Sequence, residues 1–177
     1  MKKILPWLAI ACIFTGPVFA QSGPVTITIP SGFEGPIAAS HQSGAQVNAY
    51  VKKIPGQERG TLLQITTYDF GSKLDGLPAE KLGEAANYYL AQFLAAVQRQ
   101  RESFESTEFT QVLLDGTPAA RAEWHGTSSG LKMSGTMYCA VVGSQVISLH
   151  TQGFADSPAA DTKAALAAIN SVKFDRD

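Results

Sequence analysis

Seven segments of this chain carry the alternating or β-prone apolar pattern that is typical of strands with a buried face. These segments are residues 25–29, 47–54, 62–70, 107–114, 119–125, 131–142 and 145–151. Short polar or glycine-containing turns follow several of them, at residues 55–60, 115–116 and 143–144. Because such turns join neighbouring antiparallel strands, the pattern predicts hairpins within one antiparallel sheet.

Two segments change to the helical period. Over residues 79–101, apolar side chains recur at steps of three and four, and Pro78 suits the first turn of a helix. The stripe expected to face the sheet comprises Leu82, Ala86, Tyr89, Phe93, Ala96 and Val97. A second helix is expected after Ser157-Pro158. The predicted order, three strands, a helix, four strands and a helix, indicates an α+β fold with helices flanking an antiparallel sheet.

The segment from Ser31 to Ala45 is rich in Gly, Ser and Pro, which predicts a long loop. Long loops over a rigid sheet often carry recognition. We therefore interpret Phe33, Glu34 and His41 as candidate partner-binding residues.

Tyr88 and Tyr89, with Phe93, are candidate residues for a ligand pocket between the long helix and the sheet. Aromatic residues at helical spacing are also typical of a packed core. The sequence leaves both interpretations open.

The first 20 residues have the organisation of a secretory signal peptide. A basic start precedes an apolar run over residues 4–14, which is short for a membrane span. Cleavage is predicted after Ala20, leaving residues 21–177 as one domain. We expect a periplasmic or secreted protein with no stable membrane insertion. A lipoprotein attached through Cys12 is the alternative.

The net charge limits the classes of partner, and the cysteine content limits the chemistry, that we expect of this chain. The chain has 14 basic and 15 acidic residues; without the two lysines of the signal, 12 basic residues face 15 acidic ones, a net charge of −3. This balance argues against nucleic acid and anionic lipid as partners. Cys139 is then the one remaining cysteine, and its apolar neighbours predict a buried, unreactive thiol. No cofactor and no metal is predicted.

Residues 126–130 fit the G-x-S-x-G spacing of a hydrolase nucleophile, and Ser129-Gly130-Leu131-Lys132 fits S-x-x-K. Both motifs need a helix after or around the serine, whereas a strand-like segment follows here. We interpret residues 126–130 as a five-residue hairpin loop with its glycines at positive φ. A serine hydrolase using Ser128 or Ser129 is the remote alternative.

Arg121, Glu123 and His125 share one face of their predicted strand, opposite Trp124. A carboxylate and an imidazole side by side could bind a metal or move a proton, but two ligands are few for a tight site. A solvent-facing polar row with Trp124 in the core is the simpler interpretation. Whether Glu123 and His125 belong to a weak metal site stays open.

Three short segments resemble the PsbP/Mog superfamily: residues 115–120 (Asp-Gly-Thr-Pro-Ala-Ala), residues 169–174 (Ile-Asn-Ser-Val-Lys-Phe) and residues 29–33 (Ile-Pro-Ser-Gly-Phe). The three segments are spread along the predicted mature chain, so the resemblance covers nearly all of it. The resemblance implies an α/β/α sandwich around an antiparallel sheet and a non-enzymatic accessory, docking or chaperone-like role. It implies no catalytic residues, and the metal-binding residues of some plant members have no match here.

From these observations we expect a non-catalytic periplasmic accessory protein that binds another envelope protein. The alternative is a carrier of a small or apolar ligand, held between the long helix and the sheet near Tyr88 and Tyr89. A carrier requires a cavity at that place, whereas a docking protein should have the space filled.

Overall fold

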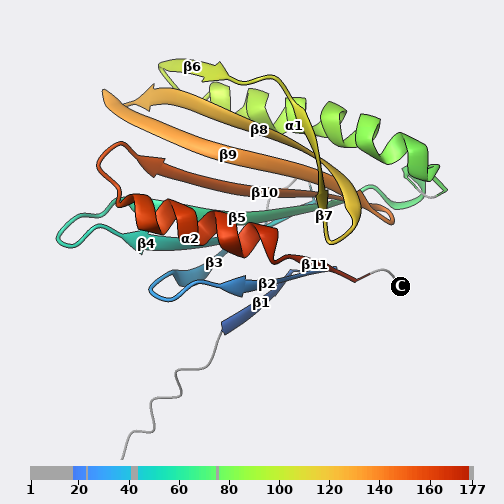
Figure 1. The fold of residues 1–177 in the computed structure, drawn as a ribbon, viewed down its shortest axis with the longest axis horizontal. Coiled ribbons are helices and arrows are strands. Elements are labelled where there is room, and N and C mark those ends of the chain that lie inside the picture. The colour runs from blue at the N-terminus through green and yellow to red at the C-terminus, as the bar shows by residue number, and fades with distance from the viewer. Residues whose placement is uncertain (1–17, 23, 41–43, 75, 176–177) are drawn as a thin grey trace, which may run out of the picture.

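The computed structural model of the protein describes residues 18–22, 24–40, 44–74 and 76–175 (Figure 1). Its strands are β1 Val18–Ser22, β2 Val25–Ile29, β3 Glu34–Ser40, β4 Ala45–Lys53, β5 Gly60–Asp69, β6 Ser103–Ser106, β7 Thr110–Leu114, β8 Thr117–Ser128, β9 Leu131–Val142, β10 Gln145–Phe154 and β11 Lys173–Phe174. Its α-helices are α1 Leu82–Gln98 and α2 Ala159–Asn170. No helix in this part of the chain is both long and apolar enough to cross a membrane.

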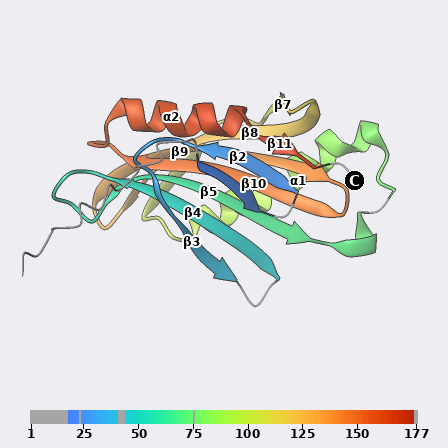
Figure 2. The same ribbon diagram turned by 90° about the horizontal axis from the view of Figure 1, so that it is seen from below.

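The strands form two antiparallel sheets. The larger has eight strands in the order β3-β4-β5-β10-β9-β8-β6, with β7 also paired to β8. The smaller has the order β1-β2-β11. Helix α1 packs on one face of the large sheet, and α2 lies with the small sheet on the other (Figures 1 and 2). The predicted α+β architecture, a sheet between helices, is confirmed.

Each face of the large sheet has its own core. Under α2, Ala165 and Ile169 pack in one cluster with Ile27 of β2 and Leu149 of β10. Under α1, the cluster contains Leu90 and Leu94 of the helix and Trp124 of β8. Each buried leucine or isoleucine among them contributes about 1.5–3 kcal/mol to folding. The two clusters together hold both helices on the sheet.

Helix α1 lies within the predicted range of 79–101. The first three residues of that range form a 3₁₀ turn, Ala79–Lys81, and the α-helix ends at Gln98. The apolar stripe is rotated, however. Its fully buried members are Ala86, Leu90 and Leu94, whereas Tyr89 and Phe93 lie at its margin. The prediction was made from steps of three and four residues, which fit more than one line of apolar side chains along the helix, and the buried line is the one through Ala86, Leu90 and Leu94.

The predicted loop from Ser31 to Ala45 is wrong: residues 34–40 form β3, an edge strand paired with β4. Its register shifts between Glu34 and Ile37, at Gly35-Pro36. Gly and Pro are tolerated at such a bulge on an edge strand, where a backbone N–H needs no partner. Composition alone therefore suggested a loop.

Two further boundaries differ. The predicted strand 107–114 corresponds to β7, which begins only at Thr110, and β6 at residues 103–106 was not predicted; both strands pair with β8. Strand β1 pairs Val18–Ser22 with β2, in a segment expected to hold the signal cleavage site and a short leader. Cleavage after Ala20, which stays a prediction, would leave Gln21 and Ser22 of β1.

The β8–β9 hairpin has a two-residue turn, not the five-residue loop predicted. Ser129 and Gly130 form it, with φ values of 50° and 72°. Positive φ at both central positions is typical of a type I′ turn, whose twist matches the flanking strands. Gly126 instead lies within β8, where an added Cβ would be 2.5 Å from the carbonyl oxygen of Ser103.

Gly135 of β9 faces Trp124 across the strands and has no space for a side chain. An added Cβ would lie 2.6 Å from Trp124 Nε1 and 2.6 Å from the carbonyl oxygen of Thr151. We therefore expect Gly135→Ala to lower the free energy of unfolding by about 1–3 kcal/mol, the usual cost of overpacking. Urea denaturation followed by circular dichroism measures this change.

The matched control is Gly153→Ala on β10, where the closest contact of an added Cβ is 3.4 Å. We expect this variant to stay within about 0.5 kcal/mol of the wild type. Equal losses in the two variants would contradict the role assigned to the Trp124–Gly135 contact.

Candidate functional site

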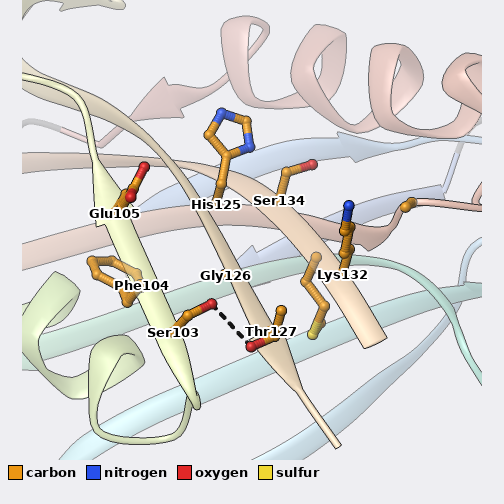
Figure 3. Close-up of a pocket in the computed structure, with 10 residues that line it drawn as sticks. Ser103, Phe104, Glu105, His125, Gly126, Thr127, Lys132 and Ser134 are labelled. Carbon is orange, nitrogen blue, oxygen red and sulfur yellow. Dashed lines mark hydrogen bonds between the residues drawn. The ribbon is translucent and has the colours of Figure 1, made fainter. Parts of the chain in front are cut away.

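Two hollows lie on opposite faces of the large sheet. The first, called here the β8 groove, is open and has a volume of about 690 Å³ (Figure 3). It is lined by Ser103, Phe104, Glu105, His125, Gly126, Thr127, Lys132, Met133, Ser134 and Ala155. These residues come mainly from β6, β8 and β9, at the end of the sheet near the β8–β9 turn.

The strand register sets the polar groups of the β8 groove. Glu105 pairs with His125, and His125 pairs with Ser134. Figure 3 shows the His125 and Ser134 side chains projecting to the same side of their strands. The Ser103 and Thr127 hydroxyls are 2.9 Å apart and hydrogen-bonded. Glu105 and Lys132 are exposed, and neither forms an ion pair with any described residue.

The polar row of β8 is confirmed as the face opposite Trp124, which is fully buried. Within the row, Arg121 forms an ion pair with Glu123 and donates a hydrogen bond of 3.2 Å to the Tyr138 hydroxyl. The Glu123 carboxylate therefore has a basic partner, Arg121, on its own strand. Across the described residues, no group of three or more His, Cys, Asp or Glu side chains could hold a metal ion together.

The second hollow, called here the Arg101 cavity, has a volume of about 240 Å³. It lies between the C-terminal half of α1 and strands β4, β5 and β10. Its lining residues are Val47, Leu62, Gln64, Thr66, Tyr68, Phe93, Ala96, Val97, Gln100, Arg101, Met137, Ser148, His150 and Gln152. Apolar side chains from α1 and β4 thus face a polar floor built on β5 and β10.

Arg101 follows α1 and is the one charged residue of this lining. Its Nη2 donates to Gln152 Oε1 at 2.9 Å, and its Nη1 donates to the Gln100 carbonyl at 3.1 Å. The guanidinium carbon lies 5.2 Å from the centre of the Trp124 ring, a cation–π contact. Nε is buried without an acceptor, and burial lowers the pKa of Arg101.

His150 lines the same cavity and is buried, with 5% of its surface exposed. Burial, with a smaller effect of the Arg101 charge, lowers the pKa of His150 to about 3. Its Nε2 accepts a hydrogen bond of 3.1 Å from Trp124 Nε1. The ring is therefore neutral near pH 7 and carries its proton on Nδ1, as a hydrogen-bond donor.

Of the five residues expected to bind a partner or ligand, the four that the structure describes do not form one site. Phe33 is only 9% exposed and belongs to the core under α2, while Glu34 is exposed at the start of β3. His41 lies outside the described residues. Tyr88 is 62% exposed on α1, and Tyr89 packs on Phe70 at 5.1 Å between ring centres.

Neither tyrosine lines the Arg101 cavity, which Phe93 does. Sequence analysis missed Arg101 and His150 as site residues, since the first is typical of a helix C-terminus and the second of a core. The signal available was a buried histidine two residues from Gln152 on one strand. That histidine indicates a site only when the structure shows that Arg101 lines the same cavity.

Ser128 and Ser129 have no catalytic surroundings in the described part of the chain. Ser128 ends β8, Ser129 lies in the turn, and β9 follows directly where a hydrolase needs a helix. No described histidine or carboxylate bonds to either hydroxyl. Cys139 is fully buried as predicted, and burial raises the pKa of its thiol far above the ordinary value.

Comparison with known proteins identifies the fold. No family model matches the sequence, and no curated protein matches it. Among solved structures, cyanobacterial PsbP from Synechocystis matches with a TM-score of 0.59 and 12% identity, over 93% of this chain and 97% of that one. The chain has the PsbP-like fold.

Two further structures share this PsbP-like fold. LpqN of Mycobacterium tuberculosis, described as involved in cell envelope biogenesis, matches with a TM-score of 0.55 and 14% identity, over 90% of each chain. A Pseudomonas aeruginosa protein of unknown function, described as a putative regulator, has a TM-score of 0.50 and 12% identity, over 88% of this chain and 94% of that one. At such identities the likeness shows the fold alone.

The buried His150 makes stability depend on pH. Its pKa is lowered to about 3 in the folded protein, against an ordinary 6.5, so the unfolded chain takes up the proton first. The stability is fully present above pH 6.5 and falls by about 1.4 kcal/mol per unit as the pH drops toward 3. Urea unfolding at several pH values in this window measures the slope.

In His150→Asn, this contribution to the slope should be absent below pH 6.5. A wild-type slope in His150→Asn would contradict a neutral, buried His150.

Proposed function

We propose that this protein is a non-catalytic accessory protein of the cell envelope that binds another envelope protein through the β8 groove. The observation that carries the proposal is the pair of exposed, unpaired charges, Glu105 and Lys132, in one open hollow. A partner segment with a basic group for Glu105 and an acidic group for Lys132 would satisfy both. The predicted signal peptide supports a location in the envelope.

The arrangement of the helices supports this use of the groove. Helix α2 packs on β2, β5 and β10, and leaves the end of β8 and β9 near their turn uncovered. Met133 and Phe104 border the groove, but their side chains pack under α1 in the cluster that contains Trp124. The groove is therefore mainly polar, which is typical of the rim of a protein–protein interface. The non-catalytic part of the proposal is supported by the surroundings of Ser128 and Ser129.

Charge reversal tests the docking proposal. We expect Lys132→Glu to weaken capture of the partner by about tenfold, because it replaces attraction by repulsion at the rim of the groove. The measurement is affinity capture from cross-linked envelope of the source organism, quantified by mass spectrometry. A single enriched envelope protein that is lost in the variant would support docking.

Lys163→Glu is the matched control, since Lys163 is exposed on α2, outside the β8 groove. It should capture the partner as the wild type does. Equal capture by all three proteins, or equal losses in both variants, would contradict docking through this groove.

A second function, a carrier of a small or apolar ligand, is supported by the Arg101 cavity. The space expected for a ligand near Tyr89 is filled by Phe70. One turn further along α1, however, hollow space remains beside Phe93. A cavity between helix and sheet is what a carrier requires and a docking protein does not.

Filling the cavity tests the carrier. We expect native mass spectrometry of the wild type to show a bound small molecule, and Ala96→Phe to lose it, because Ala96 lines the cavity. Ala95→Phe, on an exposed position of the same helix, should keep it. An empty wild-type protein, or a ligand retained in Ala96→Phe, would contradict the carrier.

A further inference from the structure

We propose that the Arg101 cavity binds a small carboxylate with a compact apolar body. This inference rests on the carrier as the second proposed function and deepens it by naming the class of ligand. It is independent of docking through the β8 groove, which lies on the opposite face of the sheet.

The charge of the lining is the first argument. Arg101 is the one charged residue among the side chains that line the cavity, and it forms no ion pair with any described residue. A partly buried guanidinium without a counter-charge is costly, because its charge is taken from water without compensation. A single negative charge in the cavity would restore the balance.

The unused donors of Arg101 are the second argument. A guanidinium has five N–H groups, and its protein hydrogen bonds, to Gln152 and Gln100, use two of them. Both acceptors are neutral amide oxygens, and Nε has no acceptor at all. A carboxylate presents two oxygens that match the planar fork of a guanidinium, which makes it the favoured occupant.

The position of Arg101 is prepared before any ligand arrives. The Trp124 ring supports one face of the guanidinium, and Gln152 and Gln100 hold its two terminal nitrogens. A side chain fixed in this way loses little conformational freedom on binding, so more of the attraction is retained as affinity. The neutral His150 and the Ser148 hydroxyl add polar lining without a second charge.

The walls and the size of the cavity select the rest of the ligand. Phe93, Val97, Val47 and Leu62 are apolar and line its sides. The volume of about 240 Å³ equals that of about eight water molecules in the liquid. It suits a monoanion of benzoate size, whose ring would contact the apolar wall while its carboxylate meets Arg101. A phosphate would fill the polar end alone.

Benzoate and benzamide are matched probes, since they share a ring and differ in charge. We expect benzoate to bind the full chain, in isothermal titration calorimetry at pH 7 and low salt, at least tenfold more tightly than benzamide or inorganic phosphate. In Arg101→Gln the affinity for benzoate should fall about tenfold or more, and Arg101→Lys should recover part of it. Arg99→Gln, on an exposed neighbour outside the cavity, should bind as the wild type does.

Near-ultraviolet circular dichroism of the variants shows whether the surroundings of Trp124 are intact, and Arg101→Lys keeps the test valid if Arg101→Gln fails to fold. No saturable binding of benzoate up to its solubility would overturn the inference. Equal affinities for benzoate and benzamide would also overturn it, while leaving the carrier intact. Tighter binding of phosphate would overturn the apolar body. The carrier itself is decided separately, by the native ligand in the wild type and in Ala96→Phe.

Discussion

The burial of the Trp124 side chain against Gly135 is the constraint on which both hollows depend. Trp124 is fully buried, and its ring centre lies 5.7 Å from that of Phe104 and 5.8 Å from that of His150. The indole ring packs against the Arg101 guanidinium, and its N–H donates a hydrogen bond to His150. It therefore positions both residues at the polar end of the Arg101 cavity. Because side chains alternate along a strand, burying Trp124 also turns Glu123 and His125 to the opposite face. One side chain therefore sets the site on either side of the sheet.

The sequence predicted elements best where one periodic pattern of apolar residues extends over many positions. Strand β9 agrees with the prediction at both ends, and α1 agrees within one turn of each, since the alternation and the helical stripe are each sustained over many residues. Strand β3 could not be found in this way, because an edge strand with Gly35 and Pro36 has the composition of a loop. The polar row of Arg121, Glu123 and His125 was predictable from alternation alone, but the Arg121–Glu123 ion pair was not.

The site residues were harder to predict for a physical reason. Arg101 and His150 are separated by the whole of β6 to β9 in the chain, and only the pairing of strands brings them to one cavity. No local sequence pattern predicts that these two residues line the same cavity. The PsbP-like fold does not indicate it either, because the three solved structures compared above are only 12–14% identical to this chain. Function has to be argued from the side chains that this chain places on the common framework.

The interrupted edges of the large sheet have a consequence for how molecules of this protein meet one another. Ile37 on β3 and Leu113 on β7 are 62% and 71% exposed, and apolar side chains on open edges invite sheets to grow from one molecule into the next. At one edge, the register shift and Pro36, which has no N–H to donate, break the row of backbone groups. At the other, the gap between β6 and β7 leaves two short strands of four and five residues. Neither border offers a long, regular row of free backbone groups, and this limits the growth of the sheet from one molecule into the next at the places where apolar side chains are exposed.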